Sequence, residues 1–401
     1  MLTLRLAPPA RLDRAAADGA TSLLDAYYAR LWQSWTPAQR FAARALGGLH
    51  GAYVVLASLA SPGAALRECL ALGFDPGEHA EARSRVTGAG RLRGFVTMRE
   101  RKGIHRLLNP AAFPLAANPL KNKARFADEC ARAGLPTPPT LAGGGALREA
   151  GGLTRWLGRA RAVMLKPAIG TKGSGIRRAS LARDGRWRLG RARLAQPRFE
   201  RRLEAELLAG SVVQHALETH PELVALSPSA LPTLRIVTCL DERGEPESAA
   251  QLLRLSAGGA SPVDNFNRGN LVAPVGADAA LGVALRKGRR GALREAAVHP
   301  ASGARILGFR VPLLAESRAL ALRAHRHFAA GFVVIGWDVG LTAAGPVLIE
   351  GNWNHGTDIV QLATGEPLAE TRLGQLYRHH LGALAPDAWR SAAPVQRERR
   401  R

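Results

Sequence analysis

Two adjacent apolar runs near the C-terminal end of the sequence constrain the fold most strongly. They are residues 332–342 (FVVIGWDVGLT) and 346–351 (PVLIEG), and both are rich in β-branched and aliphatic residues. Only Ala343, Ala344 and Gly345 separate them. A short connection that ends in Gly, between two such runs, predicts an antiparallel hairpin with a three-residue loop.

The register of this hairpin would bring oxygen donors together. With Thr342 opposite Pro346, Asp338 lies opposite Glu350, and directly opposed Cβ atoms are about 4.5–5.5 Å apart. Asn352 comes two residues after Glu350 and therefore lies on the same face. Two carboxylates this close repel each other unless a cation or a proton lies between them. Since Mg²⁺ takes carboxylate and amide oxygens, we expect a metal site here; the alternative is a solvated hairpin face with unrelated charges.

A Gly-rich segment, MLKPAIGTKGSGI (164–176), is the second strong signal. A strand is expected over 161–166 and ends in Lys166. Glycines let backbone N–H groups approach anionic oxygens, and a lysine at the strand end adds a positive charge. The order of residues in a Walker A loop is absent. The segment predicts a phosphate-binding loop, and the alternative is an ordinary strand-to-turn connection.

The rarity of lysine strengthens this interpretation. Of the 56 basic residues only six are lysines. Three of the six lie in two short motifs: Lys123, Lys166 and Lys172. In a chain that otherwise uses arginine, this placement indicates a specific role.

Length and composition limit the classes of function. The 401 residues suffice for two or three packed units, and the net charge of +24 attracts anions. A basic nucleic-acid-binding protein remains an alternative, but arginine is spread along the whole sequence and only 5% of residues are aromatic. No specific nucleic-acid partner is therefore expected. Three widely spaced cysteines form neither a disulfide framework nor a metal motif, so we expect a reducing, cytoplasmic location.

One uncharged stretch, residues 45–66, is long enough to span a bilayer. It contains His50, four glycines and Pro62, so we expect a buried helix pair instead. No apolar core follows the arginines at positions 5, 11 and 14, so no signal peptide is expected. Peripheral contact with a membrane surface through the basic N-terminal region stays open.

The remaining patterns predict a helical region followed by alternating helices and strands. Residues 22–107 have helical periodicity, TPAQ (36–39) is typical of a helix N-terminus, and the three prolines of 108–120 indicate an extended connection. Further elements are expected as a helix from 121, a hairpin over 177–189, a helix over 198–209, a strand over 211–215, paired strands within 231–256, a helix over 316–330 and a basic tail from 387.

These motifs together resemble the ATP-grasp superfamily. The order is Lys123 with AGLPTPPT, MLKP with the Gly-rich loop, VVQHALETHPEL, TLRIVT and GWDVGLT…GPVLIEGN. More narrowly, DNFNRGN, HPASGARILGFRVP and IGWDVGLTAAGPVLIEGNWN resemble the sugar-transfer-associated ATP-grasp proteins, over roughly residues 115–380. The resemblance implies an α+β ATP-grasp fold, with two α+β lobes enclosing ATP after a mostly helical N-terminal region. The implied units are 1–114, 115–210, 211–386 and the tail 387–401.

The resemblance also implies roles for individual residues. Arg235 is implied to steady the transferred phosphate, and Lys166 and Lys123 to bind the nucleotide. The phosphate lid is implied for Gly170, Thr171, Lys172, Gly173, Ser174 and Gly175. The adenine hinge and the ribose contact are implied for Gln214, His215, Leu217 and Glu218. The implied metal ligands are Asp338, Glu350 and Asn352, which would hold Mg²⁺, with Mn²⁺ as a substitute. The sequence departs from the family pattern at the hinge, at Pro232 and at Asn270.

The function implied by the resemblance is a Mg-ATP-dependent ligase. Family members typically activate a carboxylate as an acyl phosphate, which an amine then attacks, and the family name points to cell-surface polysaccharide biosynthesis. The expected partners are small or glycan-linked carboxylates and amines. A phosphotransferase that acts on a hydroxyl is the enzymatic alternative. Weaker candidates for substrate contacts are Asp264, Asn265, Asn267, Arg268, His220, His299 and His355.

Overall fold

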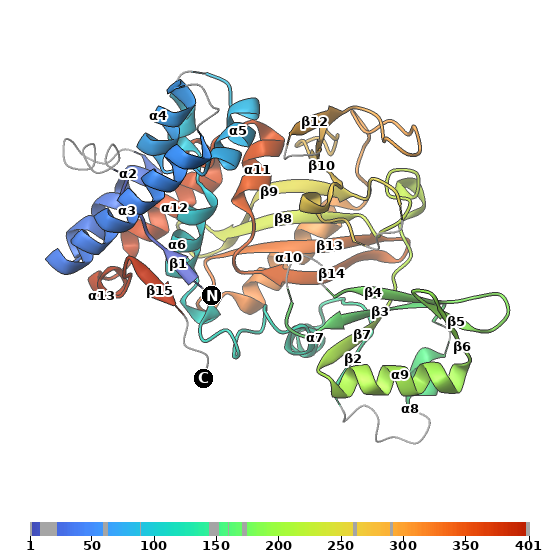
Figure 1. Cartoon of the computed structure of the whole chain (residues 1–401). Helices are drawn as coiled ribbons and strands as arrows, with labels where there is room; N and C mark the ends of the chain where they lie inside the picture. The colour runs from blue at the N-terminus through green and yellow to red at the C-terminus, as the bar shows by residue number, and fades with distance from the viewer. Residues whose placement is uncertain are drawn as a thin grey trace.

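Two large β-sheets, besides a two-stranded one, form the framework of the protein (Figure 1). The computed structural model describes residues 2–8, 22–58, 63–88, 90–143, 152–158, 160–170, 175–259, 263–288 and 292–397. The larger sheet has seven strands in the order β12-β11-β10-β9-β8-β13-β14, and the smaller has six in the order β2-β7-β3-β4-β5-β6. Within both sheets the neighbouring strands are antiparallel. The predicted α+β class with a helical N-terminal region is confirmed.

The larger sheet is covered on both faces by helices. Its strands are β8 (Thr233–Leu240), β9 (Pro246–Leu255), β10 (Leu271–Pro274), β11 (Ala284–Lys287), β12 (Leu293–Ala296), β13 (Val334–Thr342) and β14 (Gly345–Asn352). Side chains alternate between the two faces, as the period of two requires. Leu234 and Ile236 pack with α10 (Leu314–Phe328) and α7 (Lys123–Arg132), whereas Val237 and Cys239 pack in the core of the N-terminal helices.

The N-terminal helices cover part of that second face, together with helices from the end of the sequence. They are α2 (Leu23–Ser34), α3 (Pro37–Ala57), α4 (Gly63–Leu72), α5 (Pro76–Arg85) and α6 (Met98–Leu108), with α11 (Thr357–Thr364) and α12 (Arg372–Ala383). One hydrophobic core joins them to the sheet. The predicted start of α3 is confirmed, because Thr36 and Gln39 form a capping box with a Pro at the first helical position.

Residues 45–66 contribute to two helices, as predicted, but the predicted burial is wrong. The stretch contains the second half of α3 and the start of α4, and residues 59–62 lie outside the described part. Of the residues of α3, Ala43 and Val54 are buried, while its larger apolar side chains face outward. None of the described helices is long and apolar enough to cross a membrane.

The smaller sheet has a core of its own. It consists of β2 (Thr140–Ala142), β3 (Ala162–Pro167), β4 (Arg177–Leu181), β5 (Trp187–Leu189), β6 (Ala192–Leu194) and β7 (Ser211–His215). The helices α8 (Gly152–Leu157) and α9 (Gln196–Leu208) cover one face, where Trp187 stacks on Phe199. The hairpin predicted over 177–189 is confirmed, with Gly185 at positive φ in its turn. The face without helices carries Lys166 and Gln214.

The two ends of the sequence meet, which corrects the expected tail. Strand β1 (Leu2–Leu4) pairs with β15 (Val395–Arg397), and α13 (Pro386–Arg390) places Trp389 in the core. The indole of Trp35 also donates to the carbonyl of Ala392 at 2.6 Å. Residues 387–397 are therefore folded, because an aromatic anchor and strand pairing outweigh their basic composition. Residues 398–401 lie outside the described part.

Candidate active site

The predicted pairing of Asp338 with Glu350 occurs, although the hairpin loop differs from the prediction. Thr342 pairs with Gly345 instead of Pro346, so the loop has two residues, and Gly345 has a positive φ. A β-bulge between Asp338 and Val339 then shifts the register by one residue. The two differences cancel, and Asp338 lies opposite Glu350.

Asp338 lies at the centre of a buried charge network. Its Oδ1 accepts from Nε of Arg235 at 2.6 Å, and its Oδ2 accepts from Arg254 at 3.1 Å. The strands explain this, because Arg235 on β8 lies directly opposite Asp338 on β13. Asp338 and Arg235 are buried. Arg235, the candidate catalytic residue, therefore forms an ion pair with Asp338, the candidate metal ligand.

Arg254 and Thr233 are site residues that sequence reasoning missed. Arg254 on β9 donates to Oδ1 of Asp264 at 3.0 Å and to the hydroxyl of Thr233 at 3.0 Å. The Thr233 hydroxyl also donates to Asp264. Asp264 belongs to the DNFNRGN segment, which the sequence marked only as a weak candidate. One arginine among fifty carries no distinctive signal, so only its strand partner, Thr233, could have indicated it.

Burial and neighbouring charges shift the pKa values of these two carboxylates in opposite directions. Burial alone would raise the pKa of Asp338, but the guanidinium groups of Arg235 and Arg254 outweigh burial and lower it. For Asp264, burial prevails over Arg254 and the Thr233 hydrogen bond, and its pKa is raised. The pKa of Arg254 is raised by the two aspartates in spite of its burial. Asp338 is therefore anionic at neutral pH, and its charge is compensated by the protein itself.

Glu350 and Asn352 complete the predicted donor set. The Asn352 amide donates to Oε1 of Glu350 at 3.2 Å, so the two side chains lie on one side of β14 as expected. A carboxylate has about four lone-pair directions, so Asp338 keeps acceptor capacity beyond its two arginine contacts. No cluster of three or more His, Cys, Asp or Glu side chains suited to a metal occurs among the described residues. The oxygens of Asp338, Glu350 and Asn352 nevertheless match the ligands that Mg²⁺ takes, and an ion with additional water or phosphate ligands fits this set.

Lys166 faces this network from the smaller sheet. Its Nζ donates to Oε1 of Gln214 at 2.6 Å, and the Gln214 amide donates to the hydroxyl of Thr140 at 3.0 Å. Burial lowers the pKa of Lys166 to about 8, although the charge of Glu350 opposes this shift. The interaction with Glu350 places the lysine near the candidate metal ligands of the larger sheet.

Two further lysines lie beside Lys166. Lys123 begins α7, after the N-cap Asn122, and its N–H donates to the carbonyl of Ala168 at 3.0 Å. Lys121 donates to the carbonyl of Gly170 at 3.3 Å, and burial followed by the charge of Lys123 lowers its pKa. Sequence reasoning missed Lys121, although the rarity of lysine could have indicated it.

The Gly-rich loop is described only at its edges. Gly170 follows β3, and Gly175 has a φ of +73°, where a Cβ atom would lie 2.9 Å from Cγ of Pro167. Only glycine suits that position. The predicted phosphate contacts Thr171, Lys172, Gly173 and Ser174 lie outside the described residues.

The residues of the predicted hinge lie at the end of β7, and part of their backbone is hydrogen-bonded within the smaller sheet. The N–H groups of His215 and Ala216 donate to the carbonyls of Pro139 and Ala162, so they are engaged within the sheet. The His215 ring contacts the carbonyl of Trp156 at 3.0 Å, facing α8. Leu217 and Glu218 follow the end of β7 and remain the candidates for contacts with a base or ribose.

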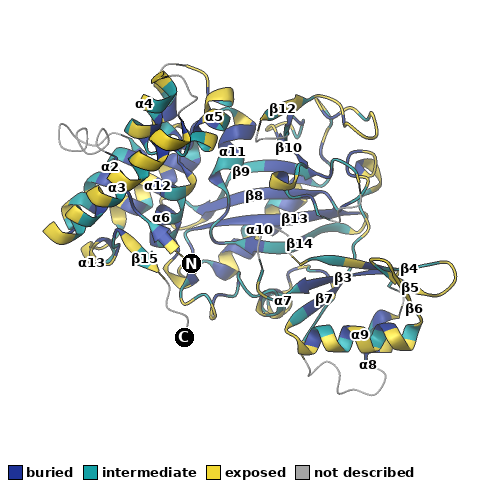
Figure 2. Cartoon of the chain, viewed as in Figure 1, coloured by how far each residue is buried: buried dark blue, intermediate teal, exposed yellow. Residues whose placement is uncertain are grey.

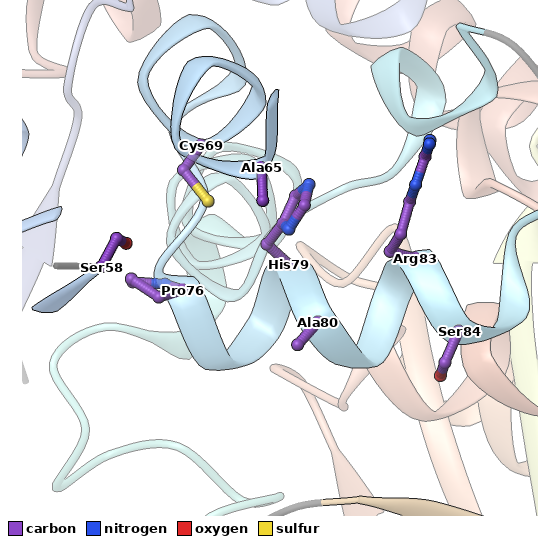
Figure 3. A pocket seen from close by; sticks show the side chains of 8 residues that line it. All are labelled: Ser58, Ala65, Cys69, Pro76, His79, Ala80, Arg83 and Ser84. Atoms are coloured by element: carbon purple, nitrogen blue, oxygen red, sulfur yellow. The ribbon is translucent and has the colours of Figure 1, made fainter. Parts of the chain in front are cut away.

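Two of the weaker candidates, His299 and His355, contact other residues of the protein. His299 bonds to the carbonyl of Ser256 at 2.7 Å and supports a turn. His355 is buried against His105, with ring centroids 4.6 Å apart. A hollow of about 410 Å³ between α4 and α5 shares no residue with the site (Figure 3). Its Cys69 thiol has a pKa raised to about 11 by burial, and its His79 is paired with Glu68.

Comparison with known proteins agrees with the resemblance seen in the sequence. A family model described as sugar-transfer associated ATP-grasp matches residues 104–375. A comparison with curated proteins gave no match.

The similar solved structures are an ATP-grasp ligase and several synthetases, all of low sequence identity. The ATP-grasp ligase PsnB complexed with minimal precursor is 14% identical, with 68% of this chain and 62% of that chain covered and a TM-score of 0.36. D-cycloserine synthetase DcsG is 17% identical, with 68% and 70% covered and a TM-score of 0.33. D-alanyl-alanine synthetase A from Vibrio cholerae O1 is 11% identical, with 70% and 66% covered and a TM-score of 0.34. This chain spans 60% of PsnB in its ADP complex, and 46% and 44% of two N5-carboxyaminoimidazole ribonucleotide synthetases. Similarity at this level does not bear on substrate.

Proposed function

Because this chain belongs to the sugar-transfer associated ATP-grasp family, we propose that it is a Mg-ATP-dependent ligase that joins a carboxylate to an amine. The observation that carries the proposal is the convergence of buried Lys166 with the charge network of Asp338, Arg235 and Glu350. The first comes from the smaller sheet and the others from the larger. We propose residues 115–210 and 211–386 as the two lobes that enclose the nucleotide.

The lysines would bind the nucleotide phosphates. Lys166 is buried, and its one hydrogen bond goes to a neutral amide, so its charge is available to an anion. Lys121 and Lys123 add positive charge on the same side. An anionic ligand that approaches Lys166 and Lys121 offsets the desolvation that lowers the pKa of both side chains. Residues 170–175 would close over the phosphates, and Leu217 and Glu218 would contact the nucleoside.

Asp338, Glu350 and Asn352 would hold the metal. Mg²⁺, when bound, neutralises phosphate charge and holds the transferred group in line with its acceptor. The bulge at Asp338 and the pairing with Arg235 fix the carboxylate in place before any ligand arrives. Arg254 also bonds to Asp338, and Asp264 pairs with Arg254 in turn.

Arg235 would stabilise the reacting groups. A carboxylate oxygen of the substrate attacks the γ-phosphorus, the bond to the β-phosphate oxygen breaks, and ADP leaves. The amine nitrogen then attacks the acyl carbon, phosphate departs, and the amine loses a proton. Nε of Arg235 is held by Asp338, so its guanidinium is oriented to donate to the acyl phosphate oxygens. The family description alone suggests sugar-linked substrates in polysaccharide biosynthesis.

Trapping the activated acid tests the proposal. Free amino acids, uronic acids and short peptides are incubated with Mg-ATP and hydroxylamine. A ligase converts its acid to a hydroxamate with ADP release that depends on that acid. ADP release with a phosphorylated hydroxyl and no hydroxamate would identify a phosphotransferase instead. Panels of amines and amino sugars, with the acid identified, then define the acceptor.

A further inference from the structure

Helix α3 directs its large apolar side chains away from the protein. Phe41, Leu49, Tyr53 and Leu56 are 76%, 70%, 53% and 69% exposed. Their spacing places them on one side of the helix, over about 22 Å of its length. Figure 2 shows α3 as an outer helix with much of its surface exposed. We call these four residues the outer face of α3.

The opposite side of α3 consists of small residues. Ala43 and Val54 are buried in the core of the N-terminal helices. A Cβ atom on Gly47 would lie 3.7 Å from the carbonyl oxygen of Ala7, and one on Gly51 would lie 3.5 Å from Cδ2 of Leu70. The helix thus packs through small residues and leaves its large ones in water, the reverse of a surface helix that faces its core. A contiguous exposed apolar face of this kind indicates a contact surface.

The formal charges of α3 itself are positive, and its His50 contacts Asp75, the N-cap residue of α5. Residues 37–57 contain no Asp or Glu. Arg44 lies one turn from Phe41 and is exposed, with its guanidinium 4.7 Å from the centre of the Trp32 ring. Arg40 lies on the side that faces α2, where its guanidinium donates to the carbonyls of Trp32 and Gln33. Long arginine side chains can keep an apolar stem against the helix while the charged head reaches lipid phosphates.

We propose that the outer face of α3 binds the surface of an anionic lipid bilayer. The apolar side chains enter the boundary between headgroups and acyl chains, and Arg44 contacts the anionic headgroups. The net charge of +24 attracts the whole protein to such a surface. The proposal is independent of the ligase function, because none of these residues belongs to the candidate active site.

A second copy of the chain fits this face less well. A two-fold contact repeats the same patch on both partners, so Arg44 of each copy would approach a surface that carries no acidic residue on its helix. Two bodies that each carry a charge of +24 also repel at a distance. Charge complementarity therefore favours an anionic bilayer.

Vesicle binding tests the proposal. The purified protein is mixed with vesicles of phosphatidylcholine alone, or of phosphatidylcholine with one-third phosphatidylglycerol, and bound protein is measured by sedimentation. We expect about tenfold stronger binding to the anionic vesicles, and a loss of about tenfold or more in the triple variant Phe41→Glu/Leu49→Glu/Leu56→Glu. The matched single variants are Leu49→Glu and Leu208→Glu, since Leu208 on α9 is 73% exposed. Leu49→Glu should weaken binding, and Leu208→Glu should not.

Three results would overturn the proposal. The first is absence of binding to either vesicle. The second is equal weakening by Leu49→Glu and Leu208→Glu, because general positive charge would then explain the binding. The third is a parent protein that dimerises on a sizing column and a triple variant that does not, which would assign the face to a second copy. Unchanged melting temperatures in the variants are required, since a fall would mean that the protein covers this face itself.

Discussion

The two halves of the candidate active site differ in how their buried charges are compensated. On the larger sheet, Asp338 meets Arg235 at 2.6 Å and Arg254 at 3.1 Å. On the smaller sheet, Lys166 meets only the neutral amide of Gln214, and within the described part of the chain no carboxylate forms an ion pair with it. The first half is neutralised by the fold. The second keeps an uncompensated positive charge.

This difference predicts which half depends on a ligand. A buried ion pair that loses one partner leaves a costly isolated charge, so the larger sheet needs its network intact to fold. Burial without an anionic partner favours the neutral form of a lysine, and it lowers the pKa of Lys166 to about 8. The smaller sheet therefore offers a positive charge to an anion, whereas the charges of Asp338, Arg235 and Arg254 on the larger sheet are already paired.

The largest effect is expected from Asp338→Ala. The substitution leaves two buried guanidinium groups without their shared carboxylate, so the free energy of unfolding should fall by about 3–5 kcal/mol. Urea denaturation measures the change. Glu366→Ala removes an exposed carboxylate and should stay within about 0.5 kcal/mol. A similar free energy of unfolding for both variants would show that the ion pairs of Asp338 do not stabilise the fold.

Glu350→Gln should separate chemistry from folding. The side chain keeps its volume but loses a negative metal ligand, so turnover should fall about 100-fold or more while the protein stays folded. Steady-state ADP release measures the loss. In the parent enzyme, Mn²⁺ should support more activity than Ca²⁺, which prefers longer and looser coordination. Turnover at the parent rate in Glu350→Gln would remove this residue from the metal site.

Lys166→Met should remove the response to nucleotide. Saturating Mg-ATP should stabilise the parent by about 2.7 kcal/mol at a hundredfold excess over Kd, and the variant should gain little. Without nucleotide the variant should be at least as stable as the parent, because a desolvated ammonium group is gone. Thermal shift and calorimetry test both statements. Lys287→Met, at a lysine paired with Glu81, is the control and should keep the full response.

The smallest effect concerns pH. Lys166 is protonated below its pKa of about 8 and binds phosphate in that form. As pH rises above about 8 the free protein loses this proton, so ATP affinity should fall by up to about tenfold per unit, or 1.4 kcal/mol. Calorimetric titrations between pH 7.5 and 9.5 measure the slope. A parent slope no steeper than that of Lys166→Met would assign the effect to another group.

The hairpin shows what the sequence could and could not predict. Apolar runs around a Gly turn indicated the strands and the pairing of Asp338 with Glu350. The loop was wrong by one residue, and the bulge at Asp338 corrected the register. A bulge depends on the twist of neighbouring strands, which a single sequence does not show.

The abundance of each residue type explains which other site residues the sequence could indicate. Lysine is scarce, so Lys166 and Lys123 were found, while Lys121 needed the contact with Gly170 to be recognised. Arg254 was hidden among fifty arginines and is identified only by its two aspartate partners. The absence of charge in 45–66 suggested burial, but both sides of α3 are apolar, and only packing reveals that the small side faces the protein.

The pairing of β1 with β15 has a consequence for biosynthesis. Residues 2–4 are synthesised long before their partners at 395–397. At about 5–20 residues per second, this interval is roughly 20–80 s. Throughout that time the strand edge and the buried Arg5, which later donates to the carbonyl of Ala393, have no native partner. The sheet formed by β1 and β15 is therefore completed only after residue 397 has been made, and a chain that stops short of residue 395 leaves β1 open to pairing with other molecules.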